Sequence, residues 1–229
     1  MYLYDREAGV SRSVSAYRLF DDFFQAFGIA GAFIPGVALV TVLLAWHIMA
    51  KDRWRIDYRT LAGMLAESLA WTMPLLVLSA ANNHARESLG VLHTAAAPGD
   101  WTALAAGSGQ SGLFGLPTGA KATIAIGAGL YEEMLFRLVG LAVLHFILVD
   151  LIGLTQRWGS GVAIVLAALA FAVYHQPALP REWANFVFIT LAGIYFGTVY
   201  VMRGFGIVVA THAIYDLLVL IVFDHGVQT

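Results

Sequence analysis

The stretch "GLYEEMLFRLVG", residues 129–140, places three charged side chains inside an otherwise apolar segment. Glu132, Glu133 and Arg137 lie in the middle of residues 121–149, which are apolar enough to cross a lipid bilayer. Ionisable groups inside a membrane are costly and usually face the interior of a helix bundle, so they mark a candidate functional site. The stretch therefore predicts a membrane-spanning helix that carries chemistry.

The composition of the whole chain is that of a membrane protein. Its 229 residues are 59% hydrophobic and only 12% charged, beyond the apolar share of most soluble proteins. The net charge of -2 and the lack of a basic block give no indication of a nucleic-acid partner. Cysteine is absent, which excludes disulfides, thiol nucleophiles and thiolate metal ligands. Carboxylate, imidazole and hydroxyl groups remain for chemistry.

Several segments match the length of about 20 largely apolar residues that a helix needs to cross a bilayer. They are residues 28–49, 61–81, 121–149, 159–176, 184–202 and 205–223. Residues 11–27 mix aromatic and charged side chains, which suits a helix lying in the membrane interface, although a solvent-facing arm has the same pattern. We therefore expect an all-α, polytopic transmembrane bundle with about six spans and an N-terminal interfacial helix.

Residues 82–120 contain too many Gly, Ser and Pro residues for a continuous span. They form either a linker or a loop or re-entrant hairpin over an active site. We expect residues 1–120 to hold the amphipathic helix, two spans and this loop. Residues 121–229 are expected to form a catalytic membrane core in a multi-pass integral membrane protein.

The two glutamates of the opening stretch have different surroundings on a helix. Glu133 and Arg137 are four residues apart and share one face, where they can form an ion pair. Glu132 points about 100° away and has no evident partner. A structural Glu–Arg pair explains Glu133 and Arg137 but leaves Glu132 without a role. A carboxylate of this kind is a candidate general base for a bound water.

Two later spans also carry ionisable side chains. His175 ends the fourth span, and His212 and Asp216 are four residues apart on the last one. A carboxylate one turn from an imidazole can fix its tautomer and orientation, although a purely structural hydrogen bond has the same spacing. Peptide hydrolysis needs a base for water and donors for the oxyanion. Together with Glu132, these residues predict an active site.

Other polar and small residues are expected to have simpler roles. His145 lies thirteen residues after Glu132, which turns it away from that side chain. Gly193 and Gly197 form a small-xxx-small face that allows close helix packing.

Read in order, "EEMLFR", "FAVYH" and "HAIYD" resemble the EExxxR, FxxxH and HxxxN/D motifs of the CPBP family. This family comprises CAAX prenyl endopeptidases and bacteriocin-processing proteins, also called Abi. The resemblance covers roughly residues 121–223 and implies an all-helical endopeptidase of a bacterial cytoplasmic membrane. It implies that Glu132 and His175 activate water, and that His212 and Asp216 stabilise the oxyanion. Glu133 and Arg137 would shape the first motif helix.

Asp216 departs from the family pattern, in which asparagine is more usual. An ionised carboxylate cannot donate a hydrogen bond, so Asp216 must be protonated, orient His212 or bind a metal. Two imidazoles and two carboxylates also make a complete ligand set for a divalent metal ion. We favour the form without a cofactor.

The partners expected from these features are the lipid bilayer and a membrane-tethered protein or peptide substrate. A transporter or proton-relay protein, or a non-catalytic scaffold or immunity protein, could carry the same buried polar residues. An uninterrupted helix through the first motif argues against a transporter, because transport sites usually lie at interrupted helices.

Overall fold

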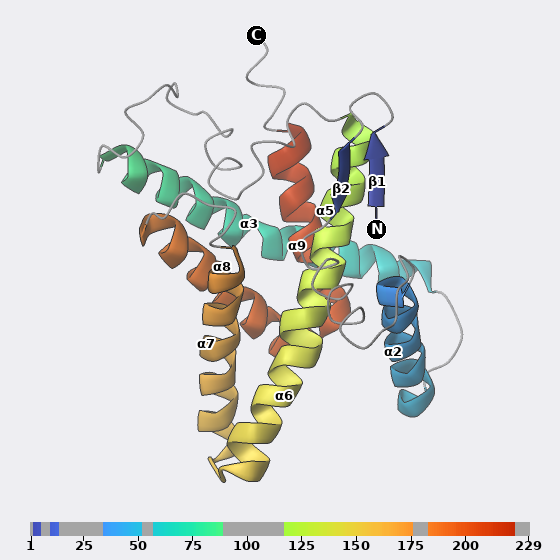
Figure 1. Cartoon of the computed structure of the whole chain (residues 1–229), viewed down its shortest axis with the longest axis vertical. Helices are drawn as coiled ribbons and strands as arrows, with labels where there is room; N and C mark the ends of the chain where they lie inside the picture. Colours follow the sequence, from blue (N-terminus) through green and yellow to red (C-terminus); the bar gives the residue numbers. More distant parts are fainter. Residues whose placement is uncertain are drawn as a thin grey trace. The chain divides into compact units, whose positions relative to one another are not determined.

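The computed structural model describes residues 2–5, 10–13, 34–51, 57–88, 117–175 and 183–222 (Figure 1). The chain forms two compact units, Met1–Met64 and Leu65–Thr229. We describe each unit by itself. The four ionisable residues predicted for the active site all belong to the second unit.

The first unit contains a short hairpin and an apolar helix. Strand β1 (Tyr2–Asp5) pairs antiparallel with β2 (Val10–Ser13), so that Tyr2 lies opposite Ser13. The predicted interfacial helix therefore does not begin at residue 11, because β-sheet pairing with β1 takes up the backbone of residues 11–13. The rest of that prediction lies outside the described residues. Helix α2 spans Ile34–Ala50.

Helix α3 (Tyr58–Ser88) runs from the first unit into the second. Asp57 caps its start, accepting hydrogen bonds from the Arg59 backbone N–H at 3.0 Å and the Thr60 hydroxyl at 2.8 Å. These bonds favour the carboxylate and hold the pKa of Asp57 below its ordinary value. Residues 82–88 were predicted as the start of the loop, but they are helical. They contain no glycine to break the helix, because the first glycine of the predicted loop is Gly90. Residues 89–116 lie outside the described part.

A long helix opens the C-terminal part of the second unit. It is continuous over Thr118–Leu151 but changes its winding along the way. Helix α5 (Thr118–Glu133) and helix α6 (Leu141–His145) are α-helical. The π-helical segment Met134–Gly140 follows α5, and the π-helical segment Phe146–Leu151 follows α6.

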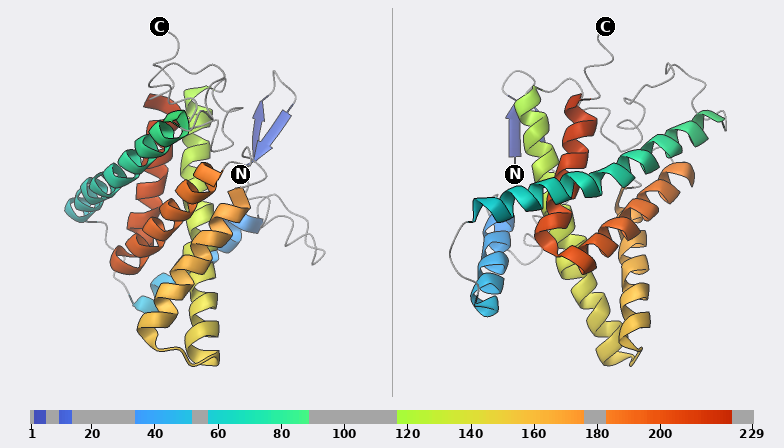
Figure 2. Two further views of the ribbon diagram at one scale, coloured as in Figure 1. Left: turned by 90° about the vertical axis from the view of Figure 1, so that its left-hand side faces the viewer. Right: turned by 180° about the vertical axis from the view of Figure 1, so that it is seen from behind.

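Three further helices complete this unit. They are α7 (Gln156–His175), α8 (Trp183–Arg203) and α9 (Phe205–Leu217), which ends in π-helical Leu218–Val222. Helix α7 packs against α8, and α9 packs against both α5 and α8 (Figures 1 and 2). Gly204 alone separates α8 from α9, and its φ of 88° is a conformation that favours glycine.

The part of α3 in the second unit is joined to α8 by polar contacts. Arg203 donates to both carboxylate oxygens of Glu67, and the Tyr195 hydroxyl donates to the Trp71 carbonyl at 2.6 Å. This places Leu75 in a core cluster with residues of α8 and α9. The unit that carries the candidate site thus includes a helix from the expected N-terminal region.

Glycines allow the helices of this unit to approach closely. A Cβ on Gly193 would lie 2.9 Å from the Cα of Ala168, and one on Gly197 would lie 3.0 Å from Ile164. The predicted small-xxx-small face is therefore confirmed, and its partner is α7. Gly129 plays the same part between α5 and α9, where a Cβ would lie 2.9 Å from the Ala213 nitrogen.

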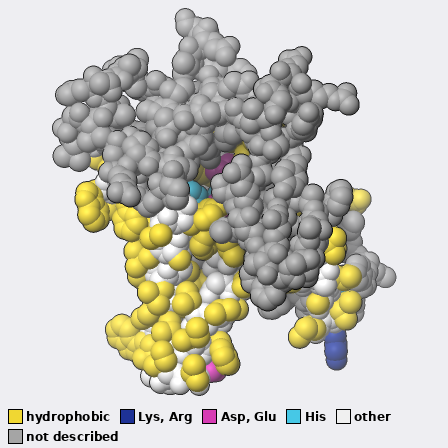
Figure 3. Space-filling model, in the orientation of Figure 1, with side chains coloured by type: hydrophobic (Ala, Val, Ile, Leu, Met, Phe, Trp, Pro, Cys, Tyr) yellow, Lys and Arg dark blue, Asp and Glu magenta, His cyan; other side chains and the backbone are white. Residues whose placement is uncertain are grey.

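Within the described residues, four helices are long and apolar enough to cross a membrane: Tyr58–Ala85, Thr118–Leu151, Gln156–His175 and Trp183–Arg203. The predicted spans 28–49 and 205–223 correspond to shorter apolar helices, Leu39–Met49 and Phe205–Ile221. Hydrophobic side chains cover much of the described surface in Figure 3. Phe146 and Trp158 are among the large hydrophobic residues that the structure leaves exposed. An apolar surface of this extent is typical of an integral membrane protein.

We expect Gly193→Ala to destabilise the helix bundle, because the added methyl group meets the backbone of α7. Overpacking of this kind costs about 1–3 kcal/mol. Gly161→Ala on α7 is the matched control, since a Cβ there has nothing within 4 Å. The measurement is thermal unfolding of both variants in the same detergent. Equal stability of the two variants would contradict the close contact.

Candidate active site

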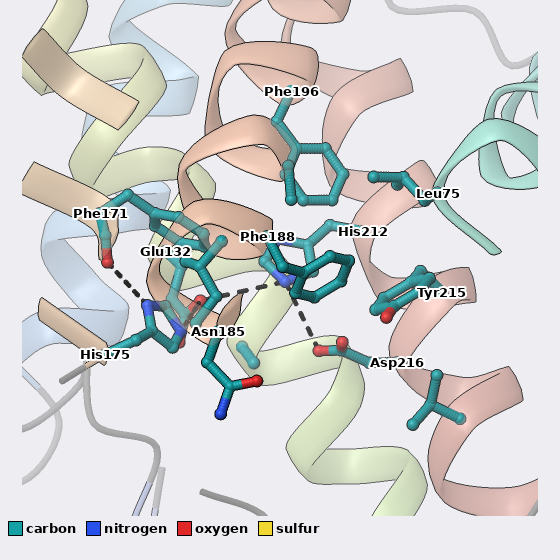
Figure 4. A pocket seen from close by; sticks show the side chains of 14 residues that line it. Leu75, Glu132, Phe171, His175, Asn185, Phe188, Phe196, His212, Tyr215 and Asp216 are labelled. Carbon is teal, nitrogen blue, oxygen red and sulfur yellow. Dashed lines mark hydrogen bonds and ion pairs between the residues drawn. The ribbon is translucent and has the colours of Figure 1, made fainter. Parts of the chain in front are cut away.

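The four residues predicted to carry the chemistry lie around one cavity. Glu132 reaches it from α5, His175 from α7, and His212 and Asp216 from α9 (Figure 4). The cavity encloses about 790 Å³ between its lining atoms, including space open to the outside. Carboxylate and imidazole atoms are visible in a hollow of the face drawn in Figure 3. The structure therefore brings together side chains from three separate helices.

Glu133 joins two helices and contacts His212, which lines the cavity. Its side chain is fully buried, and its Oε1 lies 3.1 Å from Arg137 Nη1 and 2.7 Å from His212 Nδ1. The predicted ion pair with Arg137 is present. The same oxygen also accepts the hydrogen bond from His212, so the carboxylate that orients this imidazole is Glu133 rather than Asp216.

Arg137 is enclosed by the other helices of the unit. Its Nη2 donates to the Gly193 carbonyl of α8 at 3.3 Å. Its guanidinium carbon lies 4.4 Å from the ring centre of Phe171 on α7 and 5.2 Å from that of Phe196 on α8. With 1% of its surface exposed, this cation depends on Glu133 and these ring faces for its stabilisation.

The backbone changes its winding directly after the two glutamates. The π-helical segment Met134–Gly140 begins at the residue that follows Glu133 and contains Arg137. The sequence predicted a regular α-helix here. The periodicity of apolar residues does not show where a helical turn widens into a π-helix by one additional residue. Segments of this kind occur often at functional sites, where they change the direction in which side chains point.

His175 is held by the backbone of its own helix. Its Nδ1 lies 2.8 Å from the Phe171 carbonyl oxygen, which can only accept, so Nδ1 carries the hydrogen. In the neutral ring the lone pair is then on Nε2, which lies 3.6 Å from Glu132 Oε2. This separation is too long for a direct hydrogen bond and leaves both acceptors available to a third group.

His212 presents its other nitrogen to the cavity. Nε2 lies 3.6 Å from Asp216 Oδ2 and 3.9 Å from Glu132 Oε2. The ring stacks on Phe196 with centroids 4.6 Å apart and an interplanar angle of 18°. Glu132 therefore faces one imidazole nitrogen from α7 and another from α9.

The rest of the cavity is mainly apolar. Leu75, Phe188, Ile189, Ala192 and Val219 line it. Tyr215 also lines the cavity, and its hydroxyl donates to Ser79 at 3.1 Å. An apolar lining lowers the local dielectric and suits a substrate segment with hydrophobic side chains.

Asn185, in the first turn of α8, is a polar lining residue that our sequence reasoning did not identify. In the sequence, its only distinguishing feature is a polar side chain close to the loop that precedes the predicted span 184–202. His145 lines a different pocket with Tyr200, consistent with the prediction that it points away from Glu132.

In the part of the chain that the structure describes, no group of three or more His, Cys, Asp or Glu side chains is placed to hold a metal ion. The hydrogen bonds made by the two Nδ1 atoms leave one Nε2 per imidazole facing the cavity. We derive no catalytic step through a metal.

Residues 114–218 match a protein-family model described as type II CAAX prenyl endopeptidase Rce1-like. The match includes all three motifs that carry the resemblance to the CAAX prenyl endopeptidase family, so that resemblance is confirmed for this part of the chain. No curated protein and no solved structure matches the chain.

We expect Glu133→Gln to destabilise the fold far more than the same change at Glu132. The glutamine at 133 leaves Arg137 as a buried charge without its counter-ion, and breaking a buried pair costs about 3–5 kcal/mol. Glu132 has only the two long imidazole contacts described above. Thermal unfolding of both variants in detergent measures the difference. A larger loss for Glu132→Gln would reverse the division of roles between the glutamates.

Proposed function

We propose that this protein is an intramembrane endopeptidase that hydrolyses a peptide bond in a membrane-tethered protein or peptide. The observation that carries the proposal is the position of Glu132, which faces Nε2 of both His175 and His212 inside a largely apolar cavity. The family match supports a CAAX-type intramembrane protease in general.

In the proposed reaction, Glu132 and His175 activate a water molecule. Glu132 Oε2 and His175 Nε2 lie 3.6 Å apart, which allows one water to donate a hydrogen bond to each of them. Glu132 then removes a proton while the water oxygen bonds to the carbonyl carbon of the scissile peptide. No covalent enzyme intermediate is required.

His212 is proposed to stabilise the oxyanion that forms at the carbonyl oxygen. Glu133 holds its Nδ1, so Nε2 is the atom that it offers to the cavity. In the protonated ring, Nε2 can donate to the negatively charged oxygen. When the tetrahedral intermediate collapses, the C–N bond breaks and Glu132 returns its proton to the leaving amine.

Asp216 is proposed to act without a metal. Its Oδ2 lies 3.6 Å from His212 Nε2, and a carboxylate at that distance favours the charged imidazole electrostatically. This role differs from the tautomer-fixing role that the spacing suggested, which Glu133 performs here.

The substrate is proposed to approach the cavity from the membrane. The apolar lining suits hydrophobic residues near the cleaved bond, and the family description makes a prenylated CAAX peptide the first substrate to test. We place the protein in a bacterial cytoplasmic membrane, in keeping with the bacteriocin-processing members of the family it resembles.

We expect Glu132→Gln to remove cleavage while leaving the protein folded. Loss of a general base lowers kcat by about 10²–10⁴-fold, and the amide cannot take the proton from water. The assay uses full-length protein in liposomes with two reporter peptides, one farnesylated and one anchored by an apolar helix. Unchanged cleavage in this variant would contradict the mechanism. Absence of cleavage by the wild type on both reporters would favour the transporter or scaffold alternatives.

Asp216→Asn tests the proposed absence of a metal. We expect the variant to keep substantial activity, because its amide can donate to the oxyanion and so offset the loss of the carboxylate that favours the charged His212 imidazole. We expect a strong chelator to leave the wild type unaffected. A chelator-sensitive wild type, with a loss of about 10–100-fold or more in the variant, would instead identify Asp216 as a metal ligand.

A further inference from the structure

Asn185 is a buried amide whose donor is unpaired in the described part of the chain. Only 2% of its surface is exposed, and among the described residues its Nδ2 has no hydrogen-bond partner. Leaving a buried donor unpaired is destabilising, so such groups in folded proteins call for an explanation. The residue is in the first turn of α8, yet its own helix does not use this donor.

The position of Asn185 connects it with the proposed reaction. It lines the same cavity as Glu132, His175 and Asp216. In the view of Figure 4 its amide is drawn below His175 and Asp216, and between them from left to right. A residue that only filled space would need no polar atoms there.

The oxyanion in the proposed mechanism needs a second donor. Oxyanion sites stabilise the developing charge with preorganised N–H or O–H groups. His212 can supply one, from Nε2. Asp216, when ionised, has no hydrogen to donate. An amide is a neutral donor and can fill this need without adding charge.

We infer that Asn185 is a catalytic residue that donates a hydrogen bond from Nδ2 to the oxyanion, beside His212. The inference rests on the proposed endopeptidase function. No proton is transferred in this step: the hydrogen bond strengthens as the carbonyl oxygen becomes negative and weakens again when the C–N bond breaks. The unpaired donor of the resting protein is thus paired in the transition state.

The test is the kinetics of Asn185→Leu and Asn185→Ala in liposomes with the same two reporter peptides. Leucine keeps a similar volume, and alanine cannot clash. We expect both variants to lower kcat by about 10²–10³-fold, the usual effect of removing one oxyanion donor, with KM nearly unchanged. We expect an unchanged or raised unfolding temperature, because the substitution removes an unpaired buried donor.

Thr190→Val is the matched control on the same helix. The Thr190 hydroxyl donates to the Phe186 carbonyl at 2.8 Å, and Thr190 is not among the residues that line the cavity, so the rate is expected to stay at the wild-type level.

Other outcomes would contradict either the role of Asn185 or the proposed function. Cleavage that depends on Glu132 but changes less than threefold in both Asn185 variants overturns this inference alone. A rise in KM without a fall in kcat, or a rate that falls only as far as the folded fraction does, also overturns it. A wild type that cleaves neither peptide overturns the proposed function, and this inference with it.

Discussion

The buried carboxylate of Glu133 is the interaction on which the rest of the site depends. One oxygen binds both Arg137 on the following turn and His212 on α9. Through Arg137 the same network reaches the Gly193 carbonyl of α8 and the ring of Phe171 on α7. Removing either partner of a buried ion pair is strongly destabilising, because the other charge is left uncompensated. The close helix contacts at Gly129 and Gly193 hold α5 against α9 and α8 against α7, which keeps the partners of this network within reach.

Much of the site could be predicted because its information is local in sequence. The i, i+4 spacing identified the Glu133–Arg137 pair, and the motifs identified Glu132, His175 and His212. The bond between Glu133 and His212 joins residues 79 positions apart, which the periodicity of one helix cannot reveal. The π-helical segment after Glu133 was missed for a related reason, since its apolar side chains are compatible with either winding.

Hydropathy predicted the fold as far as the length of an apolar segment identifies a membrane-spanning helix. The second to fifth predicted spans are helices long enough to cross a membrane, whereas the described parts of the first and last are shorter. Hydropathy counts apolar residues but does not show where the backbone stops being helical, and it cannot separate a short core helix from a span. Asn185 escaped notice because one amide near a loop is ordinary in sequence. Only its burial without a partner makes it distinctive.

The two imidazoles are oriented in different ways, and this affects how the protein can change over evolution. The orientation of His175 comes from the Phe171 carbonyl, a backbone group that every amino acid has, so it survives substitution at position 171 as long as the helix does. The orientation of His212 comes from the side chain of Glu133 and is lost with it. Sequence drift is therefore tolerated unequally on the two sides of the cavity. The orientation of His175 puts no constraint on the side chain at position 171, while Glu133 on α5 and His212 on α9 can change only in step with each other.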